Sequence, residues 1–334
     1  MKINFLSTLV SPSVLGSNFD VKGNPKMKKQ MKMETLCEKW LIYKKPKVKE
    51  TTISAYYRII NAHIIPHFNY DLVSFIEKKK AILAPKTVHE IFGVLKQILE
   101  YGFKKKYIKF IDCDILLPSK SRKEIKILSN ADYERFIDNV LINLNLESLG
   151  FLVALFTGVR IGELCALKWQ DIDFKTKEIK ITKTIQRVAN LDKNAKTKTK
   201  IIIDTPKSKN SIRDIDILPF LLKFLKRFKG NGTDYILTGN SKYIEPRTYQ
   251  NKFKKFIENI GIEDISPHSL RHTFATLAVE NEMDIKVLSK ILGHSSVYIT
   301  YDLYVHPSKE LRKQNMNKMA DTYPWHKKTR LLTA

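Results

Sequence analysis

The chain has 334 residues, which is long enough for two domains with hydrophobic cores of their own. A hydrophobic fraction of 43% and an aromatic fraction of 10% exclude disorder over most of the chain. Its 59 lysines and arginines outnumber 34 acidic residues, and the formal net charge of +25 favours nucleic acid as the partner. Charge alone leaves open a merely basic soluble protein or a ribosome-associated one.

The cysteines and the apolar segments bear on the compartment. Three cysteines, Cys37, Cys113 and Cys165, are far apart and form no CxxC pair, so neither a disulfide framework nor a cysteine zinc site is expected. This usage indicates a reducing, cytoplasmic compartment. The first residues show only a weak apolar run, and no segment is apolar for long enough to span a bilayer, so we expect neither secretion nor membrane contact.

The first part of the chain predicts a small helical domain. Residues 1–33 lack hydrophobic periodicity and end in a lysine-rich stretch, which predicts a flexible basic leader. Over residues 34–109 apolar side chains recur at steps of three and four, and Pro66 and Pro85 divide them into successive helices. Seven lysines on the exposed faces are predicted to bind DNA: Lys44, Lys45, Lys47, Lys49, Lys104, Lys105 and Lys106.

Residues 110–126 carry much charge and little periodicity, which predicts a basic linker between two domains. Two domains joined in this way can close around a duplex from opposite sides. An ordinary surface loop is the alternative, because composition is weak evidence for a linker.

The second domain is expected over residues 127–334. An apolar helix stops at Gly158, and Arg160 begins the next helix beside this glycine. An arginine at such a corner has a buried stem and a fixed guanidinium, which suits bidentate contact with phosphate. The alternative is an ion pair between Arg160 and Glu163, three residues apart on the helix.

Strand patterns follow at residues 178–184, 200–204 and 212–217, and the turn between the last two is predicted to be a hairpin. Lys207 lies in this turn. A turn lysine that reaches into a groove and is desolvated there can donate a proton, because desolvation lowers its pKa. We assign this role to Lys207, with Lys209 as the alternative; a merely solvated lysine also fits the pattern.

Histidine and arginine occur together near the start of a later helix. Ser266 and Pro267 predict the helix start, which places His268 and Arg271 on one face. His268 and His272 also have the spacing of metal ligands. The helical zinc pattern has a glutamate after the first histidine, however, and Arg271 would place a cation beside the metal, so no metal is expected.

His294 follows a helix that ends at Gly293, and Tyr304 lies ten positions further on. Two histidines and an arginine are donors suited to a pentacoordinate phosphorane, whose charge develops on the non-bridging oxygens. A nearby tyrosine can take the phosphoryl group covalently. For one tyrosine alone, a packing role is the better interpretation.

The order and spacing of these residues resemble the tyrosine recombinases, or phage-type integrases, over roughly residues 34–334. Five elements carry the resemblance: residues 157–164 around Arg160, 206–213 around Lys207, 267–276 with His268 and Arg271, 292–296 around His294, and Tyr304 followed by His306. The resemblance implies a predominantly α fold with a small β-sheet: an all-helical core-binding domain and an α+β catalytic domain that clamp DNA between them.

The resemblance also implies a mechanism. Tyr304 would attack a scissile phosphate and form a 3′-phosphotyrosyl link. Arg160, Arg271 and His294 would hold the non-bridging oxygens, while His268 would help accept the tyrosine proton. Lys207 would protonate the leaving 5′ oxygen. Because the bond energy is retained in the phosphotyrosine, no ATP, metal or other cofactor is expected.

The implied partners are double-stranded attachment sites and three further copies of the chain in a synaptic tetramer that forms from free monomers. A DNA-bending or directionality factor would be an accessory partner. The element served would be a phage or another mobile element of bacteria, and the tail from about Lys309, including Trp325, would be exchanged between neighbours.

One departure from the family concerns the leader, which is too short for the arm-binding domain that many integrases carry. The sequence leaves two interpretations open: a simpler recombinase, or a chain that begins inside a longer gene product. Two alternatives remain: a non-catalytic DNA-binding protein on the same scaffold, and a relaxing topoisomerase with the same chemistry.

Overall fold

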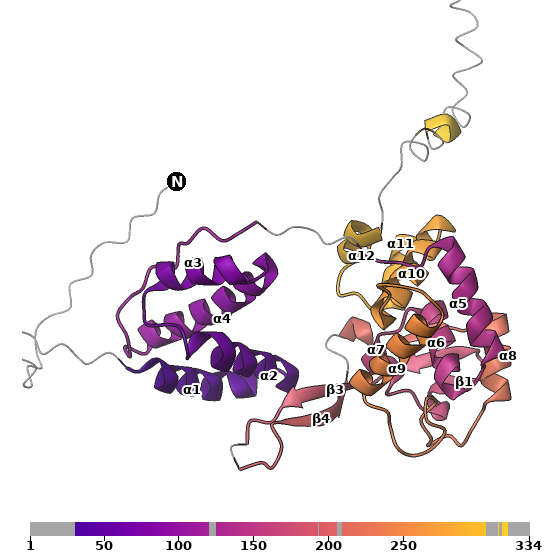
Figure 1. Cartoon of the computed structure of the whole chain (residues 1–334), viewed down its shortest axis with the longest axis horizontal. Coiled ribbons are helices and arrows are strands. Elements are labelled where there is room, and N and C mark those ends of the chain that lie inside the picture. The colour runs from indigo at the N-terminus through magenta and orange to yellow at the C-terminus, as the bar shows by residue number, and fades with distance from the viewer. Residues whose placement is uncertain are drawn as a thin grey trace, which may run out of the picture. The chain divides into compact units, whose positions relative to one another are not determined.

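The computed structural model describes residues 31–119, 125–192, 194–205, 209–304, 313 and 316–319. The chain divides into two compact units, Met1–Ser121 and Arg122–Ala334 (Figure 1). The predicted leader 1–33 lies outside the described residues except at positions 31–33. Of the predicted exchange tail, positions 313 and 316–319 are described, and Trp325 is not.

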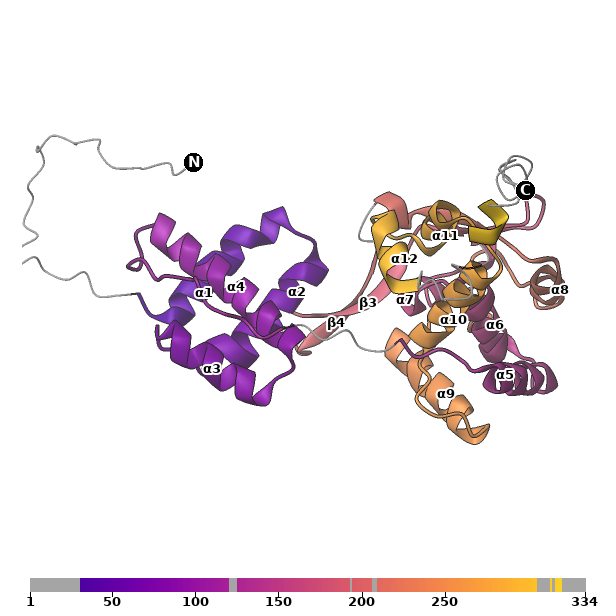
Figure 2. The ribbon, with the colours of Figure 1, turned by 90° about the horizontal axis from the view of Figure 1, so that it is seen from above.

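The first unit is helical, as the periodicity predicts. Its elements are α1 (Met33–Lys44), a 3₁₀ turn (Lys45–Lys47), α2 (Glu50–Ile59), a π-helical turn (Ile60–Ile64), α3 (Leu72–Ile82) and α4 (Pro85–Lys104). Pro85 lies at the first position of α4, where its missing N–H costs no hydrogen bond. The four α-helices pack against one another (Figure 2). The core between them includes the fully buried Trp40.

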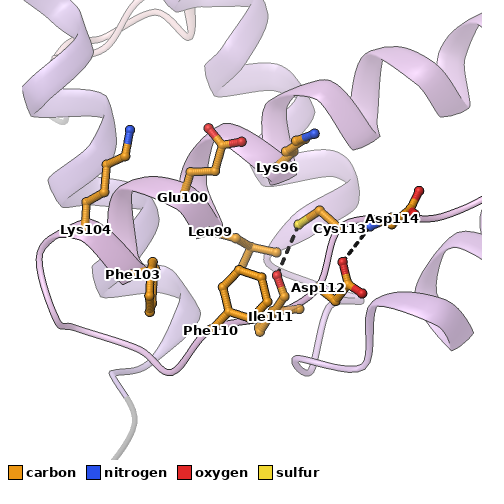
Figure 3. A pocket seen from close by; sticks show the side chains of 10 residues that line it. All are labelled: Lys96, Leu99, Glu100, Phe103, Lys104, Phe110, Ile111, Asp112, Cys113 and Asp114. Carbon is orange, nitrogen blue, oxygen red and sulfur yellow. Dashed lines mark hydrogen bonds between the residues drawn. The ribbon is translucent and has the colours of Figure 1, made fainter. Parts of the chain in front are cut away.

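The segment after α4 packs against the helical unit. Ile111, Ile115 and Leu117 contact its core, and the ring of His89 is hydrogen-bonded to the carbonyl oxygen of Pro118 at 2.9 Å. A cavity of about 420 Å³ lies between this segment and α4 (Figure 3). Much of the segment expected to be a linker is therefore part of the first unit.

The second unit combines helices with two small antiparallel sheets. The helices are α5 (Asn130–Ile142), α6 (Leu146–Thr157), α7 (Ile161–Leu164), α8 (Pro219–Arg227), α9 (Pro246–Asn259), α10 (Pro267–Glu280), α11 (Ile285–Leu292) and α12 (Val297–Tyr304). The strands are β1 (Ile172–Asp173), β2 (Glu178–Ile181), β3 (Thr184–Ala189), β4 (Thr199–Asp204) and β5 (Arg213–Asp216). This arrangement confirms the predicted fold class of mainly α with small sheets.

The pairing of the strands corrects one prediction. Residues 200–204 and 212–217 do not form a hairpin with each other: β4 pairs with β3, whereas β5 pairs with β2 in a sheet ordered β1, β2, β5. Strand β2 ends at Ile181 and β3 begins at Thr184. The single strand predicted over residues 178–184 therefore contains all of β2 and the first residue of β3. The stretch around Lys207 therefore links two sheets.

The core of the second unit is built around α6. This helix is buried along nearly its whole length, and Phe151 packs against Tyr249, Phe253 and Phe256 of α9. A smaller cluster joins α10, α11 and α12 and contains Tyr304. None of the helices within the described ranges combines the length and the apolar character that a bilayer crossing requires.

Candidate active site

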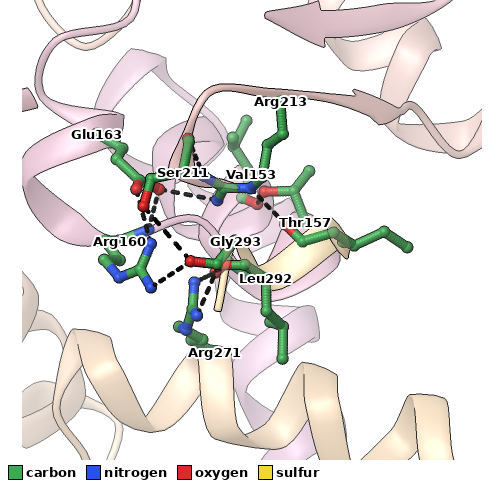
Figure 4. Close-up of polar contacts among 11 residues, drawn as sticks. Val153, Thr157, Arg160, Glu163, Ser211, Arg213, Arg271, Leu292 and Gly293 are labelled. Carbon is green, nitrogen blue, oxygen red and sulfur yellow. Dashed lines mark hydrogen bonds and ion pairs between the residues drawn. The ribbon is translucent and has the colours of Figure 1, made fainter. Parts of the chain in front are cut away.

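Arg271 is a deeply buried charged side chain of the site, with 2% of its surface exposed. Its two terminal nitrogens donate to the carbonyl oxygens of Gly158 (2.7 Å) and Leu292 (2.8 Å) (Figure 4). Those carbonyls lie where α6 and α11 end, and carbonyls at helix C-termini carry partial negative charge. Burial lowers the pKa of Arg271 to about 9, so its guanidinium is still charged at neutral pH.

The helix ends that hold Arg271 depend on glycine. Gly158 and Gly293 cap α6 and α11 with φ of 62° and 63°, in the left-handed region. A Cβ on Gly158 would lie 2.7 Å from the ring of Phe274, and one on Gly293 would lie 3.0 Å from the guanidinium of Arg213. The left-handed conformation therefore favours glycine at both positions, and the space around Gly158 also excludes a Cβ.

Glu163 organises two further arginines. Its carboxylate is 2% exposed and accepts hydrogen bonds from Arg160 and Arg213, each at 2.9 Å. It also accepts the backbone N–H of Arg160 at 3.0 Å. Burial by itself would raise the pKa of Glu163, but the hydrogen bond and charge of Arg213, together with Arg160, outweigh it and hold the pKa below its usual value.

Arg160 forms the ion pair with Glu163 that the sequence left as an alternative to phosphate contact. Its other terminal nitrogen donates to the carbonyl oxygen of Gly293 at 3.0 Å. These two bonds use two of the five N–H groups of the guanidinium, and 36% of the side chain is exposed. The ion pair therefore fixes the guanidinium and leaves donors open to a ligand.

Arg213 is a site residue that the sequence analysis did not identify. At the start of β5, it donates to Glu163, to the carbonyl of Ser211 and to the carbonyl of Ile291 in α11. Beside it, Ser211 bonds the carbonyl oxygen of Gly293 at 3.5 Å. The sequence offers one sign of this role, which is an arginine shortly after a polar turn. The buried acidic partner of this arginine comes from a distant segment.

Both assigned histidines lie near these arginines. Nδ1 of His294 is 2.8 Å from Oγ1 of the fully buried Thr300. Burial, followed by the charges of Arg271 and Arg160, lowers the pKa of His294 to about 4. His268 is exposed, yet partial desolvation and then the neighbouring positive groups lower its pKa to about 4 as well. Both rings are neutral at physiological pH.

Tyr304 differs from the other two tyrosines of α12. It is 8% exposed, whereas Tyr298 and Tyr301 are 70% and 54% exposed. Its hydroxyl is 2.6 Å from Nδ1 of His272, with the two ring centroids 5.7 Å apart. Burial raises the pKa of Tyr304, while the charges of Arg271 and Arg160 act in the opposite direction.

Five of the six residues assigned to catalysis are thus gathered in one place: Arg160, His268, Arg271, His294 and Tyr304. The sixth, Lys207, lies outside the described residues, and of Lys209 the backbone is described, in a 3₁₀ turn. Asn210, next in the chain, bonds the carbonyl oxygen of Ser295 at 3.4 Å. This bond brings the end of the lysine turn beside the turn that holds His294.

The lysines predicted to bind DNA lie where α1 leads into α2 and at the C-terminal end of α4. Lys45, Lys47, Lys104, Lys105 and Lys106 are exposed. Lys44 donates to Gln97 at 2.9 Å, and the Lys47 ammonium lies 3.5 Å from the centre of the Tyr43 ring. Among the described residues no three His, Cys, Asp or Glu side chains gather as metal ligands would.

Comparison with known proteins gives the family. Residues 126–310 match the model of the phage integrase family, and residues 32–74 match that of the phage integrase N-terminal SAM-like domain. The first of these matches spans more than half of the chain. The chain therefore belongs to the phage integrase family and is a site-specific recombinase of the tyrosine type.

Individual relatives agree with this classification. The chain is 29% identical over 262 residues to a XerC-like tyrosine recombinase of Caldanaerobacter subterraneus subsp. tengcongensis, covering 71% of this chain and 66% of that one. It is 27% identical over 288 residues to the ICEBs1 integrase of Bacillus subtilis (strain 168), covering 79% and 76%. A Tn1549 transposon integrase bound to transposon right end DNA has the same fold, with a TM-score of 0.70, 22% identity and coverage of 87% and 100%.

We expect Glu163→Gln to destabilise the second unit by about 3 kcal/mol, because removing one partner of a buried pair leaves the other charge uncompensated. Arg213, with 6% of its side chain exposed, is the charge left behind. Urea unfolding of the full chain measures the effect. Glu134→Gln, on the exposed face of α5, is the matched control and should change stability by less than about 0.5 kcal/mol.

The lowered pKa of His294 predicts a dependence of stability on pH. The folded state holds this ring neutral down to about pH 4, whereas the unfolded chain binds a proton near pH 6.5. Stability should therefore fall as the pH drops from about 6.5 to 4, by about 1–3 kcal/mol after allowance for partial exposure. When unfolding is measured at several pH values, the free energy of unfolding of His294→Asn should depend less on pH than that of the parent. The exposed His67→Asn is the control and should behave as the parent does. The same pH dependence in His294→Asn and the parent would contradict the assignment.

Proposed function

We propose that this recombinase cuts and rejoins DNA at specific sites through a covalent link between Tyr304 and a 3′ phosphate. The observation that carries the proposal is the position of the Tyr304 hydroxyl, buried among groups that suit a phosphate. The charges of Arg160 and Arg271 both act on that hydroxyl, and a nucleophile so placed can attack a phosphate bound by the same arginines.

The remaining roles follow from the charge that develops during the reaction. Arg160, Arg271 and His294 hold the non-bridging oxygens, because donors fixed before the reaction stabilise developing charge most effectively. Nδ1 of His294 is bonded to the Thr300 hydroxyl, and we assign the neutral tautomer that carries its proton on Nε2, where it can be donated to a phosphate oxygen. His268 takes part in removing the tyrosine proton, and Lys207 protonates the leaving 5′ oxygen.

The substrate we propose is double-stranded DNA at the attachment sites of a mobile element, in the bacterial cytoplasm. The excess of positive charge and the exposed lysines of the first unit support DNA as the partner. The names of the ICEBs1 and Tn1549 integrases support integration or excision of an element of that kind. Exchange between two duplexes needs four active sites, so we propose a tetramer in the synaptic complex and a monomer in free solution.

Removal of the nucleophile tests the proposal. Tyr304→Phe should bind DNA as the parent does but form no covalent complex, because a hydroxyl is lost and no phosphate contact is. The measurement is a denaturing gel after incubation with a nicked suicide site. Tyr301→Phe, at an exposed position three residues away, is the control and should still form the complex. A covalent band that persists in Tyr304→Phe would move the nucleophile elsewhere.

A sulfur substrate tests the general acid. Lys207→Ala should slow cleavage by about 10²- to 10⁴-fold, the usual contribution of positioned proton transfer. Sulfur in place of the bridging 5′ oxygen should restore the rate, because a thiolate leaves without a proton. Arg160→Ala acts on the non-bridging oxygens and should not be restored. Rescue of Lys209→Ala in place of Lys207→Ala would assign the proton to Lys209.

A further inference from the structure

The Tyr304 hydroxyl has a partner that none of the assigned roles uses. His272 lies one residue after Arg271 on α10, and its Nδ1 is 2.6 Å from the tyrosine oxygen. Both side chains are shielded from solvent, with His272 half-buried and Tyr304 buried. The contact joins residues 32 positions apart in the sequence, so it depends on how α12 packs against α10.

We infer that His272 is a catalytic residue that holds the Tyr304 hydroxyl in place and accepts its proton as the oxygen attacks phosphorus. The inference rests on the proposed function and adds a residue to it. In this step the bond between the tyrosine oxygen and phosphorus forms, and the bond from phosphorus to the 5′ oxygen breaks. The tyrosine proton moves to Nδ1 of His272, and the 5′ oxygen receives its own proton from the general acid.

The position and the charge of His272 fit a proton acceptor. A general base must lie within hydrogen-bond reach of the proton that it removes, and His272 meets this condition without any movement. Burial and the neighbouring Arg271 charge hold the pKa of His272 below its usual value, so the ring is neutral at physiological pH. A neutral imidazole that accepts on Nδ1 carries its proton on Nε2, and a bound phosphate would favour the imidazolium that forms next.

His268 stands in a different relation to the tyrosine. Among the described residues, the hydrogen bond of the Tyr304 hydroxyl goes to His272, and the ring of His268 contacts the ring of His272 instead. The two histidine rings meet edge to face, with centroids 4.5 Å apart. His268 is also the more exposed of the two and faces solvent in the free protein. These contacts favour His272 as the direct acceptor, with His268 acting behind it or on the phosphate.

The first experiment separates proton transfer from simple positioning. His272→Asn keeps an oxygen acceptor near the place of Nδ1 but supplies no base, whereas His272→Leu removes both. Single-turnover cleavage of a nicked suicide site by the full chain should slow by about 10²- to 10⁴-fold in His272→Asn, with DNA affinity unchanged. A parental cleavage rate in His272→Asn would overturn proton acceptance by this residue.

The second experiment lowers the pKa of the nucleophile itself. Replacement of Tyr304 by a difluorinated tyrosine gives a phenol that loses its proton more readily, so the need for a base is reduced. Cleavage by His272→Asn should then recover at least about tenfold, while His294→Asn, which weakens contact with the phosphate, should not recover. Absence of recovery in His272→Asn would mean that this histidine has a structural role.

A third measurement needs no DNA and keeps the test decisive. The fluorine resonance of the fluorinated Tyr304 should shift in His272→Leu, because the hydroxyl loses its hydrogen bond, and a Tyr301 label should not. An unshifted Tyr304 signal would contradict the contact. If the parent forms no covalent complex on any site, the proposed function fails. If the parent cleaves and His272→Asn cleaves at the same rate, this inference alone fails.

Discussion

The buried carboxylate of Glu163 is the group on which the site depends. A carboxylate with 2% exposure is stable only with charged partners, and Arg160 and Arg213 supply them from the preceding turn and from β5. Those arginines in turn bond carbonyls at the end of α11, at Gly293 and Ile291. One buried charge therefore holds three segments distant in sequence in a single arrangement, and the site inherits its geometry from this network.

The network is not balanced in charge. Three arginines, Arg160, Arg213 and Arg271, surround one carboxylate, and the helix-end carbonyls that hold Arg271 offer partial charges only. Burial, and after it the same excess of positive charge, lowers the pKa of His294 and keeps its ring neutral. A bound anion would relieve this imbalance. The affinity for phosphate and the stabilisation of a phosphorane that we propose would both come from this excess of positive charge.

Sequence reasoning succeeded where local pattern and packing agree. Periodicity of apolar residues gave the helical first unit, and glycine and proline positions gave the ends of α6, α10 and α11. It failed at the strands, because the alternation of apolar and polar residues does not say which strand pairs with which. Strand β4 pairs with β3, and the predicted strand had joined the start of β3 at Thr184 to β2. The segment predicted to be a linker has apolar residues that pack on the first unit.

The sequence by itself determined the family and the kinds of residue at the candidate site, because the order and spacing of Arg160, His268, Arg271, His294 and Tyr304 are properties of the chain. The tertiary structure decided which of them touch. Arg213 donates a hydrogen bond to Glu163, which lies 50 positions away in the sequence. His272 is hydrogen-bonded to Tyr304, which lies 32 positions away. No local pattern encodes such pairs, since they arise when helix packing removes water from charged and polar groups and each must find a partner among distant segments.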